Sequence, residues 1–137
     1  MKKICLYSIL LFSISLFVVS CAPDDDDDDV VPGEITGTWR SQENSETYGP
    51  SNYYVDISND SASSAGIMID NFFNLGLGKK MKASQSGNTI TLSSGVLEGF
   101  QFTGTGNVAT NYKTITWSYS FDDGNGPEQV TGTYTKL

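Results

Sequence analysis

The sequence of 137 residues contains no histidine, only two cysteines and a single arginine, Arg40. Without histidine, a Ser-His-Asp or Cys-His catalytic arrangement is excluded, and zinc sites of the usual His or Cys type are excluded after Cys21. Because Cys5 and Cys21 both precede residue 22, the rest of the chain can form no internal disulfide bond. We therefore expect a protein that is not an enzyme and that uses neither a cofactor nor a metal ion.

Positive charge is also scarce, with 8 Lys and Arg residues against 16 Asp and Glu residues. Nucleic-acid binding requires a basic surface, so we expect no nucleic-acid partner. Six of the acidic residues are consecutive: Asp24, Asp25, Asp26, Asp27, Asp28 and Asp29. Residues 33–137 carry six basic and ten acidic residues, and their net charge is only −4.

Carboxylate side chains remain as candidate catalytic groups. A pair of them, as in glycoside hydrolases, is open in principle because Glu43, Asp56, Asp70 and Glu98 are available. No pair is distinguished by its local sequence, and charged residues on strands and loops are usually solvated. We expect these four side chains to face solvent.

The N-terminal segment has the layout of a cleavable secretory signal, because Lys2 and Lys3 precede an apolar run from Ile4 to Val19. The tetrapeptide Val18-Val19-Ser20-Cys21 resembles the lipobox of bacterial lipoproteins. This resemblance implies removal of residues 1–20 by cleavage between Ser20 and Cys21, and a lipid anchor on Cys21, with diacylglycerol held as a thioether and acyl chains such as palmitate. The alternatives are an ordinary signal peptide and an uncleaved span, although 16 apolar residues are fewer than the roughly 20 that a membrane helix needs.

Residues 21–32 are expected to form an acidic tether. Like charges repel, so the aspartate run should stay solvated and extended, with a reach of at most about 40 Å. Aspartates directly after a lipidated cysteine resemble the export signal of surface lipoproteins in Bacteroidota-type Gram-negative bacteria. The resemblance implies a protein that is anchored in the outer membrane by its lipid and exposed at the cell surface. The alternative is an outer-membrane lipoprotein that faces the periplasm.

Residues 33–137 are expected to form one all-β domain, because apolar and polar residues alternate in short segments separated by turn residues. Eight segments are predicted: about 35–42, 52–58 and 66–72, two strands that flank 86–88, and about 96–106, 114–121 and 128–136. Eight consecutive strands with short connections favour an antiparallel up-and-down barrel, which leaves no exposed sheet edge. The alternative is a two-sheet β-sandwich.

Two short motifs carry a family resemblance. Gly37-x-Trp39 opens the first predicted strand and Gly132-x-Tyr134-x-Lys136 ends the last, and together they look like the small lipocalin-like domains of bacterial lipoproteins. In lipocalins this tryptophan packs across the closed end of the barrel, so the resemblance implies that Trp39 is a structural plug. The chain departs from the family at Lys136, which stands where lipocalins usually have an arginine stacked on the tryptophan.

The interior of an eight-stranded barrel can either be filled by side chains or hold one small molecule. The predicted inward positions are mostly bulky: Trp39, Tyr53, Ile57, Ile67, Ile69, Met81, Phe100, Phe102, Trp117, Tyr119 and Phe121. This pattern favours a packed core. The alternative is a small cavity with one open end, in which Tyr53, Trp117 and Tyr119 would contact the ligand.

Two loops carry short motifs. The segment 122–127, Asp-Asp-Gly-Asn-Gly-Pro, lacks the ligand spacing of a calcium loop and is predicted to be a hairpin turn. Asp60-Ser61-Ala62 resembles the sequon for O-glycosylation of exported proteins in the same bacterial group. It lies on the longest polar loop, and Ser61 is therefore the candidate for modification.

These observations indicate binding rather than turnover. The first hypothesis is a surface module whose loops around Tyr48 to Tyr54 contact a glycan, a peptide or a partner protein. The second is a carrier that holds a small hydrophobic ligand in the barrel. The third is a barrel-type inhibitor that inserts a loop into the active site of a hydrolase.

Overall fold

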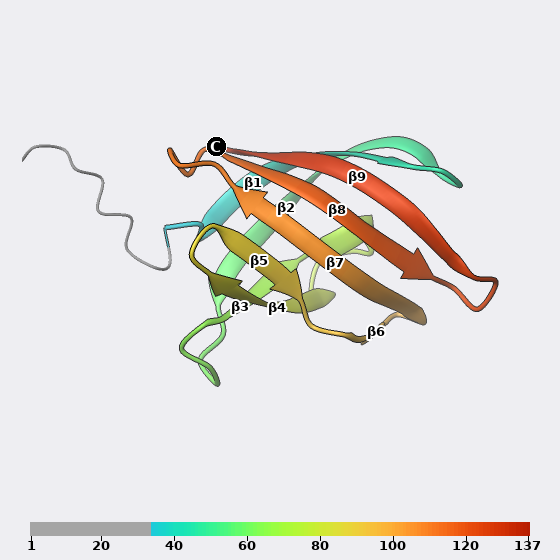
Figure 1. Cartoon of the computed structure of the whole chain (residues 1–137), viewed down its shortest axis with the longest axis horizontal. Helices are drawn as coiled ribbons and strands as arrows, with labels where there is room; N and C mark the ends of the chain where they lie inside the picture. The colour runs from blue at the N-terminus through green and yellow to red at the C-terminus, as the bar shows by residue number, and fades with distance from the viewer. Residues whose placement is uncertain (1–33) are drawn as a thin grey trace, which may run out of the picture.

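The computed structural model describes residues 34–137, which form a closed antiparallel β-barrel (Figure 1). No helix in this part of the chain is long and apolar enough to cross a membrane. The elements are β1 (Gly37–Ser45), β2 (Gly49–Asn59), β3 (Gly66–Asp70), the 3-10 turn η1 (Phe72–Asn74), β4 (Lys80–Ser86), β5 (Thr89–Leu92), β6 (Gly95–Leu97), β7 (Phe100–Val108), β8 (Thr114–Asp122) and β9 (Pro127–Lys136).

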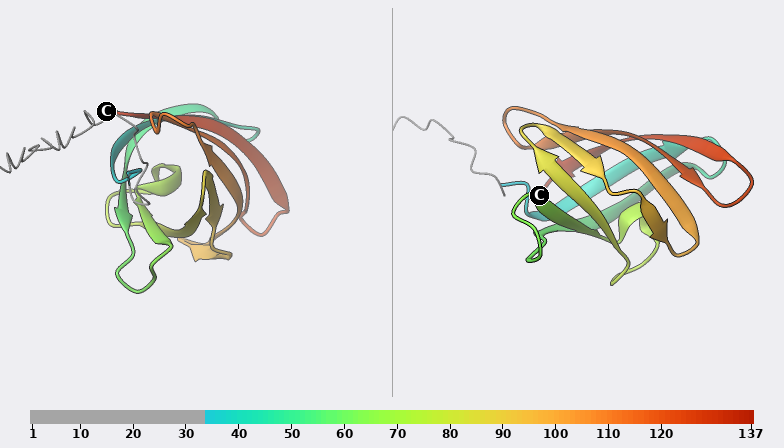
Figure 2. Two further views of the ribbon diagram at one scale, coloured as in Figure 1. Left: turned by 60° about the vertical axis from the view of Figure 1, so that its left-hand side comes forward. Right: turned by 60° about the horizontal axis from the view of Figure 1, so that its bottom comes forward.

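Eight of these strands close the ring, as the view along the barrel shows (Figure 2). β1 pairs with β2 on one side and with β9 on the other, and β5 pairs with β7. β6 is a short additional strand that pairs only with β7. The prediction of an eight-stranded antiparallel barrel is confirmed, and the β-sandwich alternative is wrong because the strands form one continuous sheet.

Several strand boundaries differ from the predicted ones, and three of the differences bear on the site. The first strand ends at Ser45 rather than near residue 42, so three more residues continue the alternation between the two faces. The third ends at Asp70, because Asn71 adopts a left-handed conformation with φ 60°. The predicted strand 96–106 is divided into β6 and β7 by Glu98 and Gly99, whose φ angles of 54° and 85° turn the backbone.

One end of the barrel is closed by Trp39, which is fully buried. Its Nε1 atom donates a hydrogen bond of 2.7 Å to the Ile35 carbonyl oxygen, and the Lys136 Nζ atom lies 5.7 Å from the centroid of the indole ring. Lys136 also donates to the Glu34 carbonyl oxygen. Both ends of the described chain therefore lie at this closed end (Figure 1), where the Leu137 amide bonds to Thr38.

The opposite end is partly filled by η1. Phe72 of this turn is fully buried, and its ring lies 5.1 Å from the rings of both Phe102 and Tyr119 on the far wall. All the predicted interior side chains are buried except Phe100, which is half-buried. The sequence pattern predicts Phe72 at the end of a strand, whereas it packs into the barrel from a turn.

Candidate functional site

The barrel holds a buried carboxylate. Glu43 points inward from β1 and is only 4% exposed, so the expectation that it is solvated is wrong. The Tyr53 hydroxyl donates a 2.5 Å hydrogen bond to Glu43 Oε2, and the Tyr134 hydroxyl donates one of 3.3 Å to Oε1. Each carboxylate oxygen is thus held by a phenol from a different neighbouring strand.

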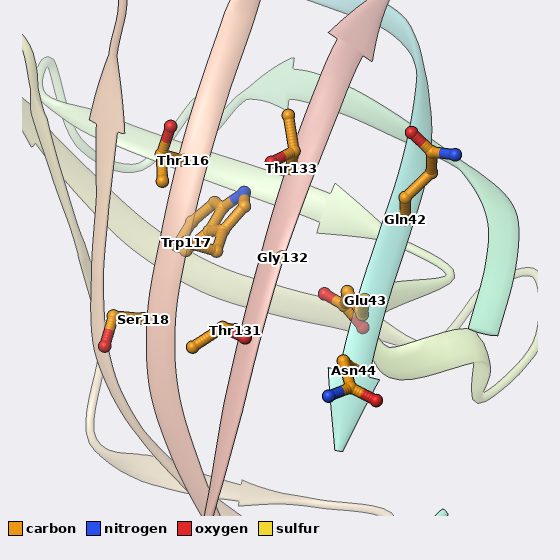
Figure 3. Close-up of a pocket in the computed structure, with 9 residues that line it drawn as sticks. All are labelled: Gln42, Glu43, Asn44, Thr116, Trp117, Ser118, Thr131, Gly132 and Thr133. Carbon is orange, nitrogen blue, oxygen red and sulfur yellow. The ribbon is translucent and has the colours of Figure 1, made fainter. Parts of the chain in front are cut away.

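Small residues make room for this carboxylate. Gly132 of β9 lies directly across from Glu43, and a Cβ atom there would come within 2.6 Å of Glu43 Cγ. Trp117 of β8 flanks the same glycine on its other side (Figure 3). Two residues before Glu43, Ser41 separates Tyr53 from Tyr134 in the same way. Alternation of large and small residues around the ring lets the two phenols reach the carboxylate.

Burial controls the protonation of this cluster. Loss of solvation raises the pKa of Glu43, and the hydrogen bonds from Tyr53 and Tyr134 oppose that rise. Burial also raises the pKa of Tyr53, Tyr119 and Tyr134, and the Glu43 charge adds to the increase. The phenols therefore remain neutral donors at ordinary pH, and the carboxyl is the group in the cluster that titrates.

A pocket of about 320 Å³ opens at the η1 end of the barrel and reaches Glu43. Its walls combine buried Val130 with half-buried aromatic and aliphatic side chains of η1 and its neighbours. The ring of Tyr48, which is 58% exposed, lies 5.7 Å from that of Phe121 and 6.0 Å from that of Phe73. The full lining is Glu43, Ser45, Tyr48, Gly49, Ser51, Phe73, Asn74, Leu75, Phe100 and Val130.

The three side chains predicted as ligand contacts lie deeper. Tyr53, Trp117 and Tyr119 are 7%, 1% and 1% exposed, and none of them lines the pocket at the η1 end. The Tyr119 hydroxyl and Trp117 Nε1 have no hydrogen-bond partner within residues 34–137, and the same is true of Ser41 Oγ. The pattern of the sequence could have found Glu43, because positions 39, 41, 43 and 45 continue one face of β1.

A second hollow lies on the outer face of the barrel, where β1, β9 and β8 run side by side (Figure 3). Its volume is about 640 Å³. Two rows of uncharged polar side chains border it: Gln42, Thr133 and Thr116 on one side, and Asn44, Thr131 and Ser118 on the other. Between these rows it is also lined by Gly132 and by the two side chains that flank this glycine, Glu43 and Trp117 (Figure 3). We call this feature the outer furrow.

The other carboxylates singled out in the sequence do not join Glu43. Asp56 and Asp70 are directly paired across β2 and β3, and Asp56 accepts a hydrogen bond of 2.6 Å from Thr38. Glu98 forms a 2.8 Å ion pair with Lys79. Among residues 34–137 no group of three Asp, Glu, His or Cys side chains is placed to hold a metal ion.

The loop motifs lie where the sequence placed them. Asp122 Oδ1 accepts hydrogen bonds from the amides of Gly124 and Gly126 in the β8–β9 hairpin, as predicted for a turn. Ser61 is exposed in the loop between β2 and β3. Ser20, Cys21 and the aspartate run 24–29 lie outside the described residues.

No protein-family model matches this chain, and no curated protein matches it at a significant level. Solved structures of other proteins do align with it. The structure of mFAP2b bound to DFHBI aligns with a TM-score of 0.53 and 15% identity, over 75% of this chain and 94% of that one. A redesigned beta barrel aligns with a TM-score of 0.52 and 12% identity, over 75% and 91%. At such low identity these similarities establish the barrel fold alone.

Proposed function

We propose that this protein is a non-enzymatic binding protein of the outer membrane, anchored through Cys21, that takes up a small ligand at the η1 end of its barrel. The observation that carries the proposal is the 320 Å³ pocket, which combines aromatic and aliphatic walls with one buried carboxylate. Pockets of this kind, apolar with a few placed polar groups, are typical of small-molecule sites. The similar barrel mFAP2b, which was solved with bound DFHBI, supports a ligand role for this architecture.

The direction of the chain supports the same arrangement. Glu34, the first described residue, lies at the closed end beside Lys136, and the pocket lies at the other end. A tether formed by residues 21–32 would thus join the barrel at the end away from the pocket. In a surface-exposed lipoprotein, the ligand would enter from the side that faces the medium.

The binding proposal can be tested with a neutral aromatic probe, 2-naphthalenemethanol, by isothermal titration calorimetry. At about 0.3 kcal/mol per non-hydrogen atom, a probe of this size should bind with a Kd on the order of a millimolar or tighter. Ser51→Trp places a large side chain on the pocket wall and should abolish binding. The matched control is Asn52→Trp on the outer face of the same strand, which should leave binding unchanged. Equal binding by both variants would refute the pocket as the site.

The anchor needs its own experiment. Full-length protein and its Cys21→Ala variant would be expressed in a Gram-negative host, and the membrane fraction analysed by intact mass. We expect a wild-type species that starts at residue 21 and is heavier by its acyl groups, and an unlipidated variant. Unlipidated wild-type protein released into the periplasm would refute the anchor and leave the binding proposal to stand alone.

A second candidate function uses the outer furrow. Its hydroxyl and amide side chains match the hydrogen-bonding groups of a glycan, and its volume of about 640 Å³ exceeds that of the inner pocket. Thr131→Ala and Thr133→Ala should weaken glycan binding on an array without changing the titration of 2-naphthalenemethanol. Glycan binding that survives both changes would remove the furrow from consideration.

A further inference from the structure

Glu43 is the only charged side chain that is buried among residues 34–137, and no Lys or Arg there pairs with it. The one ion pair of this region joins Lys79 to Glu98 at the surface. A buried carboxylate loses its hydration, and two neutral phenols offset only part of that cost. When Glu43 is ionised, its charge is therefore one that a cation from outside the protein would neutralise.

The pocket that leads to Glu43 has no cationic wall. Its lining contains neither Lys nor Arg, so nothing on the path to the carboxylate repels a cation. The rings of Tyr48, Phe73 and Phe100 lie along this path, and aromatic faces attract cations. The connecting loops of this end, 46–48, 71–79, 93–99 and 123–126, carry three acidic residues and one lysine, which is already paired with one of the three.

The geometry of the hydrogen bonds leaves room for a further donor. Tyr53 and Tyr134 each donate to one oxygen of Glu43. A carboxylate offers about four lone-pair sites, so each oxygen can accept at least one more hydrogen bond. An ammonium group carries three N–H donors, which suits a carboxylate that two fixed phenols already orient.

We propose that the pocket selects an organic cation, with a primary ammonium group bonded to Glu43 and an aromatic or aliphatic body between Tyr48, Phe73 and Phe100. This inference rests on the proposed function, because it names the ligand class for the same pocket. An anionic ligand would be repelled by Glu43 and by the acidic loops, and a neutral ligand would leave the buried charge without compensation.

Three probes of similar shape but different charge distinguish a cationic, a neutral and an anionic ligand. They are 2-naphthylmethylamine, 2-naphthalenemethanol and 2-naphthoate, each titrated into the protein by calorimetry at pH 7.5. A charge-assisted hydrogen bond to a buried carboxylate predicts that the amine binds about 10- to 100-fold more tightly than the alcohol. The naphthoate should show no binding. Glu43→Gln should reduce the amine to the affinity of the alcohol and leave the alcohol itself unchanged.

The pH dependence of probe affinity in the wild-type protein tests the role of Glu43 without a substitution. The titratable groups that face Glu43 are Tyr53, Tyr119 and Tyr134, and all three stay neutral because burial raises the pKa of each. The affinity for the amine should therefore fall as the pH is lowered through the raised pKa of Glu43, whereas the affinity for the alcohol stays flat.

The outcomes are distinct. If the alcohol binds as tightly as the amine at every pH, the selection for cations is refuted while the pocket remains a ligand site. If none of the three probes binds, the proposed function itself fails. If the amine binds more tightly but Ser51→Trp does not affect it, the cation binds elsewhere and the inference is also refuted.

Discussion

Lys136 of β9 pairs in register with Trp39 of β1, and its ammonium group lies above the indole ring at 5.7 Å from the centroid. The resemblance to lipocalins implied an arginine at this position. The lysine makes the corresponding cation–π contact and also bonds to the Glu34 carbonyl oxygen. A single side chain thus covers the closed end and ties the first described residue to the last strand.

Substitution of Lys136 tests this contact. A cation–π contact whose cation stays partly solvated contributes about 0.5–1 kcal/mol, so Lys136→Met should lower the free energy of unfolding by roughly that amount. Lys136→Arg should retain or improve the stability, because guanidinium stacks well on tryptophan. Urea denaturation measures both. An arginine variant that is as unstable as the methionine variant would show that the charge over Trp39 contributes nothing.

Glu43 should make stability depend on pH in an unusual direction. Burial raises the pKa of Glu43 above its ordinary value of 4.5, so the native state holds its proton more tightly than the unfolded state. The contribution is fully present below about pH 4.5 and is lost as the pH rises through the raised native pKa. Wild type should therefore lose stability relative to Glu43→Gln over this interval. Urea denaturation of both proteins from pH 4 to pH 8 measures it, and parallel curves would contradict the prediction.

Phe72 fills the barrel from the η1 turn, so its removal should leave a cavity. Phe72→Ala is expected to lower the free energy of unfolding by about 3–5 kcal/mol. Leu77→Ala is the matched control on the same connection, because Leu77 is 83% exposed and its loss should change stability by less than about 0.5 kcal/mol. Equal effects would mean that Phe72 does not pack as described.

Gly132 and Glu43 should be energetically coupled. Gly132→Ala places a Cβ atom 2.6 Å from Glu43 Cγ, and overpacking of this kind costs about 1–3 kcal/mol. In a Glu43→Ala background the cost should fall, with a coupling energy of about 0.5–3 kcal/mol in a double-mutant cycle. Gly95→Ala, whose new Cβ meets nothing closer than 3.9 Å, is the control. Strict additivity would contradict the proposed crowding.

Ser61 offers a test of the modification motif. It is exposed in the loop that follows β2, where Asp60 Oδ1 accepts a hydrogen bond from the Ala62 amide. In a Bacteroidota host, Ser61→Ala should lose a mass of sugar size, while Ser63→Ala in the same loop should retain it. An unchanged intact mass of Ser61→Ala would reject the glycosylation prediction.

The strands were predictable because burial follows a strict alternation. In β8, Ile115, Trp117, Tyr119 and Phe121 are all inward, and their polar neighbours are outward. A period of two is a direct consequence of strand geometry, so apolar residues identify the inner face without further information. The ring closure followed from the number of strands and the short connections.

The site was harder to predict, because its central residue breaks the rule that identifies the strands. Charged residues on strands usually face solvent, so a glutamate is expected to point outward even though the alternation along β1 places position 43 on the inner face. Tyr53 and Tyr134 lie 81 residues apart in the sequence, and only the pairing of β1 with both β2 and β9 brings them to Glu43. The placement of Phe72 depends similarly on the left-handed backbone of Asn71, which the sequence alone did not reveal.

The barrel is joined by ladders of unequal length. β1 and β9 share seven register pairs, whereas β5 and β7 share only three, from Thr89↔Asn107 to Thr91↔Thr105. Local opening starts where the fewest hydrogen bonds must break, so the seam between β5 and β7 should separate at a lower free energy than global unfolding. Opening along this seam would expose the interior of the barrel along one line of its wall, and amide hydrogens there should exchange well before those of β8 and β9.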